Sequence, residues 1–262
     1  MKNPTLCKGV VLVDKPSGMT SFDVVEKTCK ILGAGRGGHA GTLDPNVTGL
    51  MLIALEEARK AMPVLMGMDK EYEGTMLIHA DAEREAVENA FKKFTGEIIQ
   101  KPPVKSRVAR VERKRRVNWL KILRTQGREV AFSVSCEAGT YIRKLIHDIG
   151  QALECGAHMT ELRRTKIGPF TIDEAVPLSK LSEKDVVPLE QILERVGLKK
   201  VIVNDEAIVK IRNGSPVFPD FILSREEAKE NELIGIFDAR KKIIALGKTL
   251  GDKIKTERVF LF

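Results

Sequence analysis

Residues 38–49 read Gly-His-Ala-Gly-Thr-Leu-Asp-Pro-Asn-Val-Thr-Gly, and this stretch carries the strongest structural signal in the chain. Pro45 biases the preceding Asp44 away from helical geometry and toward an extended backbone. The glycines leave room for a ligand to approach the backbone closely. Such a loop can present one carboxylate, that of Asp44, to a bound molecule. An aspartate before a proline is also a common turn former, so the residues alone leave both interpretations open.

A second glycine-rich stretch lies just before this loop. Residues 33–38, Gly-Ala-Gly-Arg-Gly-Gly, match the GxGxxG pattern of dinucleotide-binding loops. That pattern binds pyrophosphate where a strand precedes the glycines and a helix follows them. Here a helix that begins near Thr20 with a capping-box pattern precedes them, and the loop continues toward Asp44. The order of elements argues against a nucleotide site.

The hydrophobic patterning around the loop predicts a mixed α+β domain. Apolar or alternating runs predict strands at residues 9–13, 49–55, 72–79, 117–123 and 129–136. Helical spacing predicts helices at residues 20–32, 83–95 and 141–153, and a helix from about Glu56 that Pro63 interrupts. Because strands and helices alternate without regular βαβ spacing, we expect a mixed sheet with flanking helices.

The end of the chain has a different pattern. Residues 179–200 are charged with helical spacing, and we expect them to end the first domain. Residues 201–262 carry short strand patterns separated by turn glycines, which predicts a small β-rich module.

Length and composition limit the class of protein. The chain has 262 residues with 43% hydrophobic and 31% charged residues, enough for one large domain and a small one. No apolar run is long enough to cross a membrane, and the first eight residues lack a signal-peptide core. The cysteines show no metal-ligand or disulfide spacing, so we expect reduced thiols, no metal and a cytoplasmic location; they are Cys7, Cys29, Cys136 and Cys155.

Positive charge is concentrated in one segment. The formal net charge is +8, and residues 101–130 alone hold eleven Lys or Arg against two Glu. Such a segment suits a polyanion, although a solvated basic face is an equally ordinary explanation. With one Trp in the chain, phosphate contact is favoured over base stacking. We therefore predict RNA-backbone contacts for Lys105, Arg107 and Arg110.

Five segments in order resemble motifs of the TruB/dyskerin-type pseudouridine synthases. The loop at 38–49 resembles the family's signature loop, and residues 12–21 (Leu-Val-Asp-Lys-Pro-Ser-Gly-Met-Thr-Ser) resemble its N-terminal motif. The other three are residues 69–72, 139–150 and 156–170. The resemblance covers about residues 8–180. It implies the pseudouridine synthase fold, whose central sheet is mixed and largely antiparallel, and isomerisation of uridine in RNA without a cofactor.

The resemblance also implies catalytic roles for three residues. Asp44 matches the carboxylate that attacks the target nucleoside, and Tyr72 matches the tyrosine that stacks on the flipped base and is implicated in proton abstraction. Arg143 matches the arginine that pairs with and orients the carboxylate. The alternatives are an ordinary core aromatic for Tyr72 and an exposed helix arginine for Arg143.

Three further residues match positions near the RNA. His39 matches a loop histidine close to the RNA backbone, although a structural histidine is an alternative. Leu162 matches the apolar side chain that packs against the target base. Lys15 is grouped with the RNA-binding residues, and together with Pro16 it matches a pair that supports the loop.

The C-terminal module helps to indicate which branch of the family the chain resembles. Residues 201–262, with Gly-Ser-Pro-Val-Phe at 214–218, resemble a PUA domain, an RNA-binding module. We expect a catalytic domain at residues 8–185 and a PUA-like domain at 199–262. Details of the motifs resemble the archaeal H/ACA branch, which implies a guide RNA, small accessory proteins and rRNA or tRNA substrates. The alternatives are a stand-alone tRNA T-loop enzyme and an inactive RNA-binding scaffold.

Overall fold

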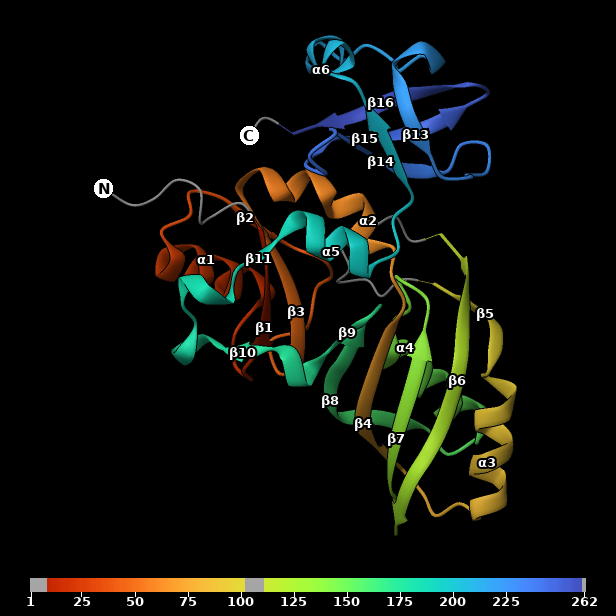
Figure 1. Ribbon diagram of the computed structural model, residues 1–262. Helices are drawn as coiled ribbons and strands as arrows, with labels where there is room; N and C mark the ends of the chain where they lie inside the picture. Colours follow the sequence, from red (N-terminus) through yellow and green to blue (C-terminus); the bar gives the residue numbers. More distant parts are fainter. Residues whose placement is uncertain (1–8, 102–110, 261–262) are drawn as a thin grey trace.

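Two β-sheets organise the computed structural model, which describes residues 9–101 and 111–260 (Figure 1). The larger sheet contains β1 (Gly9–Lys15), β2 (Gly37–His39), β3 (Thr48–Leu55), β4 (Lys70–Ile78), β5 (Gly96–Gln100), β6 (Arg113–Gln126), β7 (Glu129–Cys136), β8 (Ala157–Ile167), β9 (Phe170–Thr171), β10 (Val176–Pro177) and β11 (Val187–Pro188). The smaller sheet contains β12 (Lys200–Val203), β13 (Ile222–Arg225), β14 (Leu233–Phe237), β15 (Ile243–Leu250) and β16 (Lys253–Val259).

Neighbouring strands in the larger sheet follow the order β10-β1-β3-β8-β4-β7-β6-β5, with β11, β2 and β9 paired to β1, β3 and β8. Among the described strands of this sheet, β1–β10 and β3–β8 pair in parallel and all other pairs are antiparallel. The predicted mixed, largely antiparallel sheet is therefore confirmed.

Helices cover both faces of the larger sheet. They are α1 (Ser21–Leu32), α2 (Met62–Met66), α3 (Arg84–Lys93), α4 (Ile142–Ala152), α5 (Leu189–Arg195) and, beside the smaller sheet, α6 (Asp205–Arg212). Short 3₁₀ turns are η1 (Glu56–Ala61), η2 (Ile172–Glu174), η3 (Leu178–Lys180), η4 (Glu183–Asp185) and η5 (Pro219–Phe221). In Figure 1 helix α4 lies behind strands β4 and β7, and α3 lies beside β6 at the edge of the sheet.

Strand β1 shows how the core is divided. Its side chains point alternately to the two faces, so Val11 and Val13 join the cluster that includes α1, α3 and α4. Val10 and Leu12 join a second cluster that includes α5. Because both faces of β1 are buried, its sequence is a continuous apolar run rather than an alternating one.

The sequence did not predict strand β8, although it lies between β3 and β4 in the sheet. Residues 157–167 lack clean apolar alternation and include Arg163, Arg164 and Lys166. Each of these cations finds its partner in tertiary structure, on Asp14, on backbone carbonyls and on Glu71. Periodicity within one segment carries no information about such partners.

Three other predictions differ from the structure. The helix expected from Glu56 is a 3₁₀ turn followed by α2, with Pro63 in the first turn of α2, where its missing N–H costs nothing. The helical pattern at residues 179–200 yields α5 only, preceded by 3₁₀ turns and two-residue strands. Helix α6 lies within the module expected to be β-rich, and its start is marked by the Asn204 side chain, which accepts from the N–H of Ala207.

The two sheets share one hydrophobic cluster. Phe237, Ile243 and Leu246 of the smaller sheet pack with Ile192 and Leu193 of α5. The Lys60 ammonium also donates to the Val259 carbonyl at 2.7 Å. The division at residues 8–185 and 199–262 stays a prediction, whose outer limits at 8, 261 and 262 lie outside the described residues.

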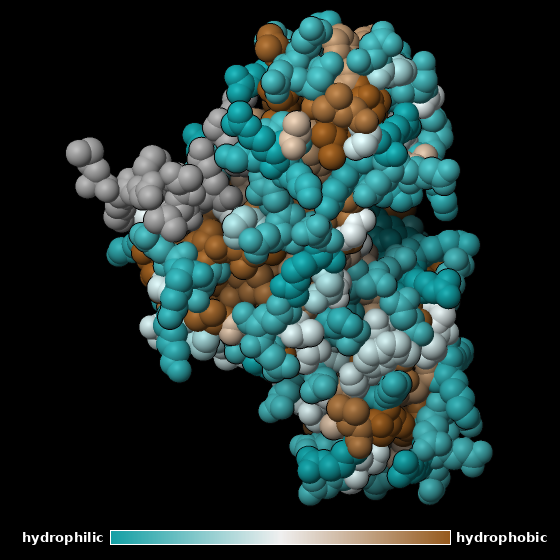
Figure 2. Space-filling model, viewed as in Figure 1, coloured by the Kyte–Doolittle hydropathy of each residue, from teal (hydrophilic) through white to brown (hydrophobic). Residues whose placement is uncertain are grey.

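Hydrophilic side chains dominate the face shown in Figure 2, and hydrophobic residues gather there in separate patches. Among the described residues, the large hydrophobic side chains that are exposed come from several elements; they include Phe22, Ile99, Leu123, Val209 and Leu223.

Gly150 marks the closest approach of α4 to the start of β8. A Cβ placed there would lie 2.1 Å from the Ala157 nitrogen, so Gly150→Ala should lower the free energy of unfolding by about 1–3 kcal/mol. Gly67 is the matched control because its φ is −73° and its Cβ would meet nothing closer than 3.6 Å. Gly67→Ala should raise stability by about 0.4–1 kcal/mol. Urea unfolding measures both, and equal effects of the two variants would contradict this account of the packing.

Candidate active site

Asp44 lies in the loop that connects β2 to β3. Its carbonyl accepts a hydrogen bond from the Val47 N–H at 3.0 Å, so the backbone of Asp44 begins a tight turn. Its carboxylate forms an ion pair with the guanidinium of Arg143. The backbone of Asp44 therefore makes the turn that the sequence allows, and its side chain is 48% exposed.

Lys15 supports this loop from the protein interior. The side chain is fully buried at the end of β1, and its ammonium donates to the carbonyls of Pro16, Pro45 and Val47 at 2.9, 2.8 and 2.7 Å. These bonds use all three protons of the ammonium. Burial lowers the pKa of Lys15, while the charge of Asp23 opposes that shift. This geometry favours a supporting role for Lys15 over direct contact with RNA.

Ser21 and Gly18 also form hydrogen bonds with the backbone of this loop. The Ser21 hydroxyl accepts from the N–H of Leu43 at 2.8 Å and lies 3.0 Å from the Leu43 carbonyl, to which it donates. The Gly18 N–H donates to the Pro45 carbonyl at 3.0 Å. Residues on both sides of Asp44 are therefore fixed through the backbone, and none of these bonds uses the Asp44 carboxylate.

Arg143 comes from the first turn of α4. The Gln100 side chain, which is 2% exposed, positions this helix because it accepts from the Tyr141 N–H at 3.0 Å and donates to the Tyr141 carbonyl at 3.2 Å. The Arg143 and Asp44 side chains are 55% and 48% exposed, so their ion pair contributes only about 0–1 kcal/mol to stability. The contact places the Arg143 guanidinium directly against the Asp44 carboxylate.

Tyr72 lies in the middle of the larger sheet, on β4 opposite Arg164 of β8. It is 8% exposed and belongs to the hydrophobic cluster of α1, α3 and α4, so it is a core aromatic whatever else it does. Burial raises the pKa of its phenol, and the Arg164 guanidinium opposes this rise by its charge and a hydrogen bond. The phenol is therefore protonated at neutral pH.

His39 lies at the end of β2, and Leu162 lies on β8. Nδ1 of His39 accepts from the Gly41 N–H at 3.4 Å, and burial together with the charge of Arg164 lowers the pKa of this imidazole. Leu162 lies on β8 opposite Gly74, where any Cβ would come within 3.0 Å of a Leu162 methyl group. A glycine at position 74 therefore makes the space that Leu162 occupies.

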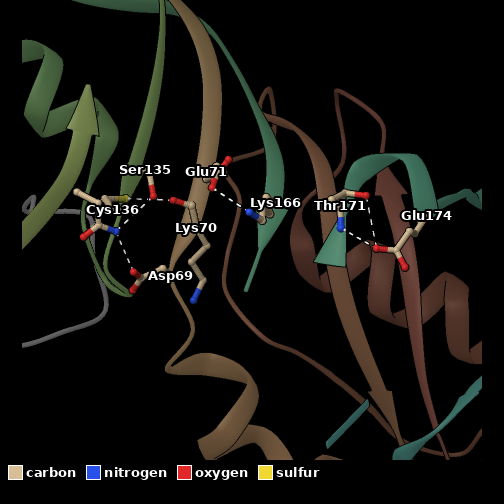
Figure 3. A network of polar contacts seen from close by, with 9 residues as sticks. Asp69, Lys70, Glu71, Ser135, Cys136, Lys166, Thr171 and Glu174 are labelled. Carbon is tan, nitrogen blue, oxygen red and sulfur yellow. Dashed lines mark hydrogen bonds and ion pairs between the residues drawn. The ribbon is translucent and has the colours of Figure 1, made fainter. Parts of the chain in front are cut away.

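Lys70, two residues before Tyr72 in the motif at residues 69–72, is a buried cation for which the sequence predicted no role of its own. Its ammonium donates to the carbonyls of Met66 and Met68 at 2.8 and 2.6 Å, and its own carbonyl accepts from the Cys136 thiol at 3.8 Å. Figure 3 shows the Lys70 side chain pointing away from Ser135 and Cys136. Burial, reinforced by the charge of Arg164, lowers the pKa of Lys70 to about 8. Burial raises the pKa of Cys136 to about 12, so its thiol stays neutral.

The basic segment is described only in part. Lys105, Arg107 and Arg110 lie outside the described residues. On β6, Lys114 pairs with Glu97 and the largely buried Arg115 pairs with Glu137, while Arg113 and Arg116 are exposed. The described half of the segment therefore combines structural ion pairs with exposed positive charge.

Neither a metal site nor a membrane helix emerges from residues 9–101 and 111–260. No group of three or more His, Cys, Asp or Glu side chains in those ranges could hold a metal ion. No helix there is long and apolar enough to span a membrane.

Sequence reasoning found the proposed catalytic residues but missed most of the residues that support them. Ser21, Lys70, Gln100 and Arg164 all make hydrogen bonds to backbone groups of distant segments. Their only signal in the sequence is that they lie inside or beside the motifs that carry the family resemblance. A single polar residue does not reveal which distant backbone group it will bind.

Comparisons with known proteins identify the family of this chain. Residues 29–88 match the model of the TruB family pseudouridylate synthase N-terminal domain, residues 143–210 match the tRNA pseudouridylate synthase B C-terminal domain, and residues 199–258 match the PUA domain. The chain is 42% identical over 257 residues to a probable tRNA pseudouridine synthase B of Methanosarcina barkeri, covering 92% of this chain and 75% of that protein. A protein of the same description from Methanopyrus kandleri is 40% identical over 92% of this chain and 76% of its own length.

Solved structures show the same fold. The match to a Cbf5–Nop10–Gar1 complex has a TM-score of 0.86 at 37% identity and covers 98% of this chain and 86% of that chain. An archaeal box H/ACA sRNP Nop10–Cbf5 complex also gives 0.86, at 35% identity, over 99% of this chain and 89% of that chain. Fold and site therefore define an RNA-modifying isomerase. The chain belongs to the TruB family of pseudouridine synthases and carries a C-terminal PUA domain.

The lowered pKa of Lys70 predicts a pH dependence of stability. The folded protein holds this proton with a pKa of about 8, against 10.5 for an ordinary lysine, so the unfolded chain binds more protons between these values. Stability from this group should therefore rise from pH 8 to 10.5, by on the order of 1–3 kcal/mol. Urea unfolding of wild type and Lys70→Met across this range isolates the contribution, because the variant lacks the group. Parallel curves would contradict the assignment.

Proposed function

We propose that Asp44, Arg143 and Tyr72 carry out the isomerisation of a uridine that has left the RNA stack. The observation that supports this most strongly is the Asp44–Arg143 ion pair, which holds a half-exposed carboxylate on a loop whose backbone is otherwise fixed. In the reaction the N1–C1′ bond breaks, a C5–C1′ bond forms, the proton on C5 is released and N1 takes up a proton, so that the product is an isomer of the substrate. Asp44 is the group that attacks the nucleoside.

Tyr72 and Leu162 supply the apolar side of the proposed pocket. A flipped base loses its stacking partners, which costs a few kcal/mol, and contacts in the pocket offset this cost. Tyr72 lies on β4, and Leu162 lies on the paired strand β8 two residues from the register partner of Tyr72, so both side chains come from rigid elements. Burial keeps the Tyr72 phenol protonated, so it contributes as an aromatic surface and hydrogen-bonding group rather than as a phenolate. His39 and the exposed arginines of β6 contact the RNA backbone.

We infer that the chain acts as the catalytic subunit of an H/ACA guide ribonucleoprotein, with rRNA and possible tRNA substrates. The similar Cbf5 structures are complexes with Nop10 and Gar1, and one similar structure is an H/ACA RNP bound to substrate RNA. The PUA domain match supports RNA as the partner. The reading as a stand-alone tRNA enzyme has its own support, because the similar archaeal proteins are described as tRNA pseudouridine synthase B.

A cytoplasmic location completes the proposal. Cys136 and Cys155 form no disulfide within the described chain, which fits a reducing compartment. Cys7 lies outside the described residues.

The role of Asp44 has a direct test. Asp44→Asn keeps the size of the side chain and removes its charge, so pseudouridine formation should fall below detection while RNA affinity stays within about threefold. The matched control is Asp148→Asn on α4, whose carboxylate pairs with Lys144 one turn away. The control should retain activity. Pseudouridine is quantified by mass spectrometry of digested RNA, and normal turnover by Asp44→Asn would end the proposal.

The choice of RNA is tested by reconstitution. The full chain is incubated with a tRNA transcript alone, and with an rRNA fragment plus an H/ACA guide RNA and the two small accessory proteins. A guide ribonucleoprotein should modify the rRNA fragment only when the guide is present. Rapid modification of the tRNA with no activity in the guided reaction would instead establish the stand-alone enzyme.

A further inference from the structure

Two consecutive arginines on β8 have opposite environments. Arg163 is 42% exposed at its side chain and makes two hydrogen bonds to the Asp14 carboxylate at 3.0 and 2.8 Å. Arg164 is 1% exposed and is among the largest fully buried side chains of the described chain. A buried guanidinium is expensive because it has lost its hydration. The position of Arg164 therefore requires a compensating set of contacts.

The contacts of Arg164 reach both ends of the Asp44 loop. Its Nε donates to the Leu50 carbonyl at 2.7 Å, and one terminal nitrogen donates to the Gly41 carbonyl at 3.1 Å. The planar guanidinium has its donors in a rigid fork, so two bonds in different directions fix the distance between the two carbonyls. Asp44 lies between Gly41 and Leu50 in the chain.

The backbone of Arg164 is pressed against the same loop. Gly49 pairs with Arg164 in the parallel β3–β8 contact, and its φ of +110° is one that favours glycine. A Cβ at Gly49 would lie 2.3 Å from the Arg164 carbonyl oxygen. Strand β8 therefore meets the end of the loop with no space between the two backbones.

Arg164 also lies beside Tyr72. The two residues are register partners in the antiparallel β4–β8 pair, and the charge of the guanidinium acts on the phenol. One buried group thus binds the loop that carries Asp44 and lies on the strand next to the aromatic ring proposed to receive the base. Arg143 orients the Asp44 carboxylate from the protein surface, whereas Arg164 binds the backbone of the loop from the protein interior.

We propose that Arg164 is a positioning residue that sets the Asp44 loop at a fixed distance from Tyr72. It acts through backbone carbonyls and the phenol, and it does not touch the substrate. This inference rests on the roles proposed for Asp44 and Tyr72. Reacting groups must be held to within a fraction of an ångström, and a shift of about 1 Å lowers the rate on the order of 10²-fold.

The test compares neighbouring arginines in the full chain. Arg164→Lys keeps the charge but replaces the two separate donor nitrogens of the planar guanidinium with a single nitrogen, and Arg164→Gln removes the charge as well. Single-turnover pseudouridine formation should fall on the order of 10²-fold in Arg164→Gln and less in Arg164→Lys. RNA affinity should stay within about threefold in both, because the residue is buried and does not contact RNA. Arg163→Gln and Arg163→Lys are the matched controls and should stay within about threefold of wild type in both measurements.

Amide hydrogen exchange distinguishes positioning from general stability. In Arg164→Gln the Val47 N–H, which closes the turn at Asp44, should exchange at least tenfold faster, while amides of β7 remain protected as in wild type. A structural role alone would raise exchange throughout the larger sheet.

Three results would overturn the proposal. They are full activity of Arg164→Lys and Arg164→Gln, an equal loss in the Arg163 variants, or failure of both Arg164 variants to fold, which would make Arg164 a folding residue. Failure of the proposed chemistry is recognised separately, because Asp44→Asn would then retain activity while the Arg164 variants could still loosen the loop.

Discussion

Two buried cations fix the loop on which the rest of the site depends. Lys15 binds the carbonyls that follow Asp44, and Arg164 binds carbonyls before and after it. A buried charge is costly unless its hydrogen bonds are satisfied, and here backbone carbonyls satisfy both. Because a carbonyl carries no net charge, neither cation neutralises the Asp44 carboxylate. These bonds fix the backbone of the loop, and none of them uses the Asp44 carboxylate.

Different residues fix the backbone of the Asp44 loop and pair with its exposed carboxylate. Arg143 meets Asp44 at the surface, where an ion pair adds little stability. Lys15 and Arg164 bind the backbone of the loop, whereas Arg143 pairs with the Asp44 side chain.

The smaller sheet is part of the same packed body. Its Phe237, Ile243 and Leu246 share a hydrophobic cluster with α5, and Lys60 binds the Val259 carbonyl across the junction. The PUA domain is thus held against η1 and α5 by apolar packing and by the partly buried hydrogen bond from Lys60 to Val259. A nucleic acid bound to it would be presented to the larger sheet in a defined orientation.

The sequence by itself determined the elements with local signals. Continuous apolar runs marked β1 and β3, and the motif residues led to Asp44, Tyr72 and Arg143, of which the structure joins Asp44 to Arg143 directly. Only the tertiary structure decided where the polar strand β8 lies and what Arg164 and Lys70 bind. The physical reason is that a hydrophobic pattern is a property of one segment, whereas the partner of a buried cation is a carbonyl supplied by another. The Asp44 loop could be located from its residues, but the groups that hold it became identifiable only when distant strands were brought together.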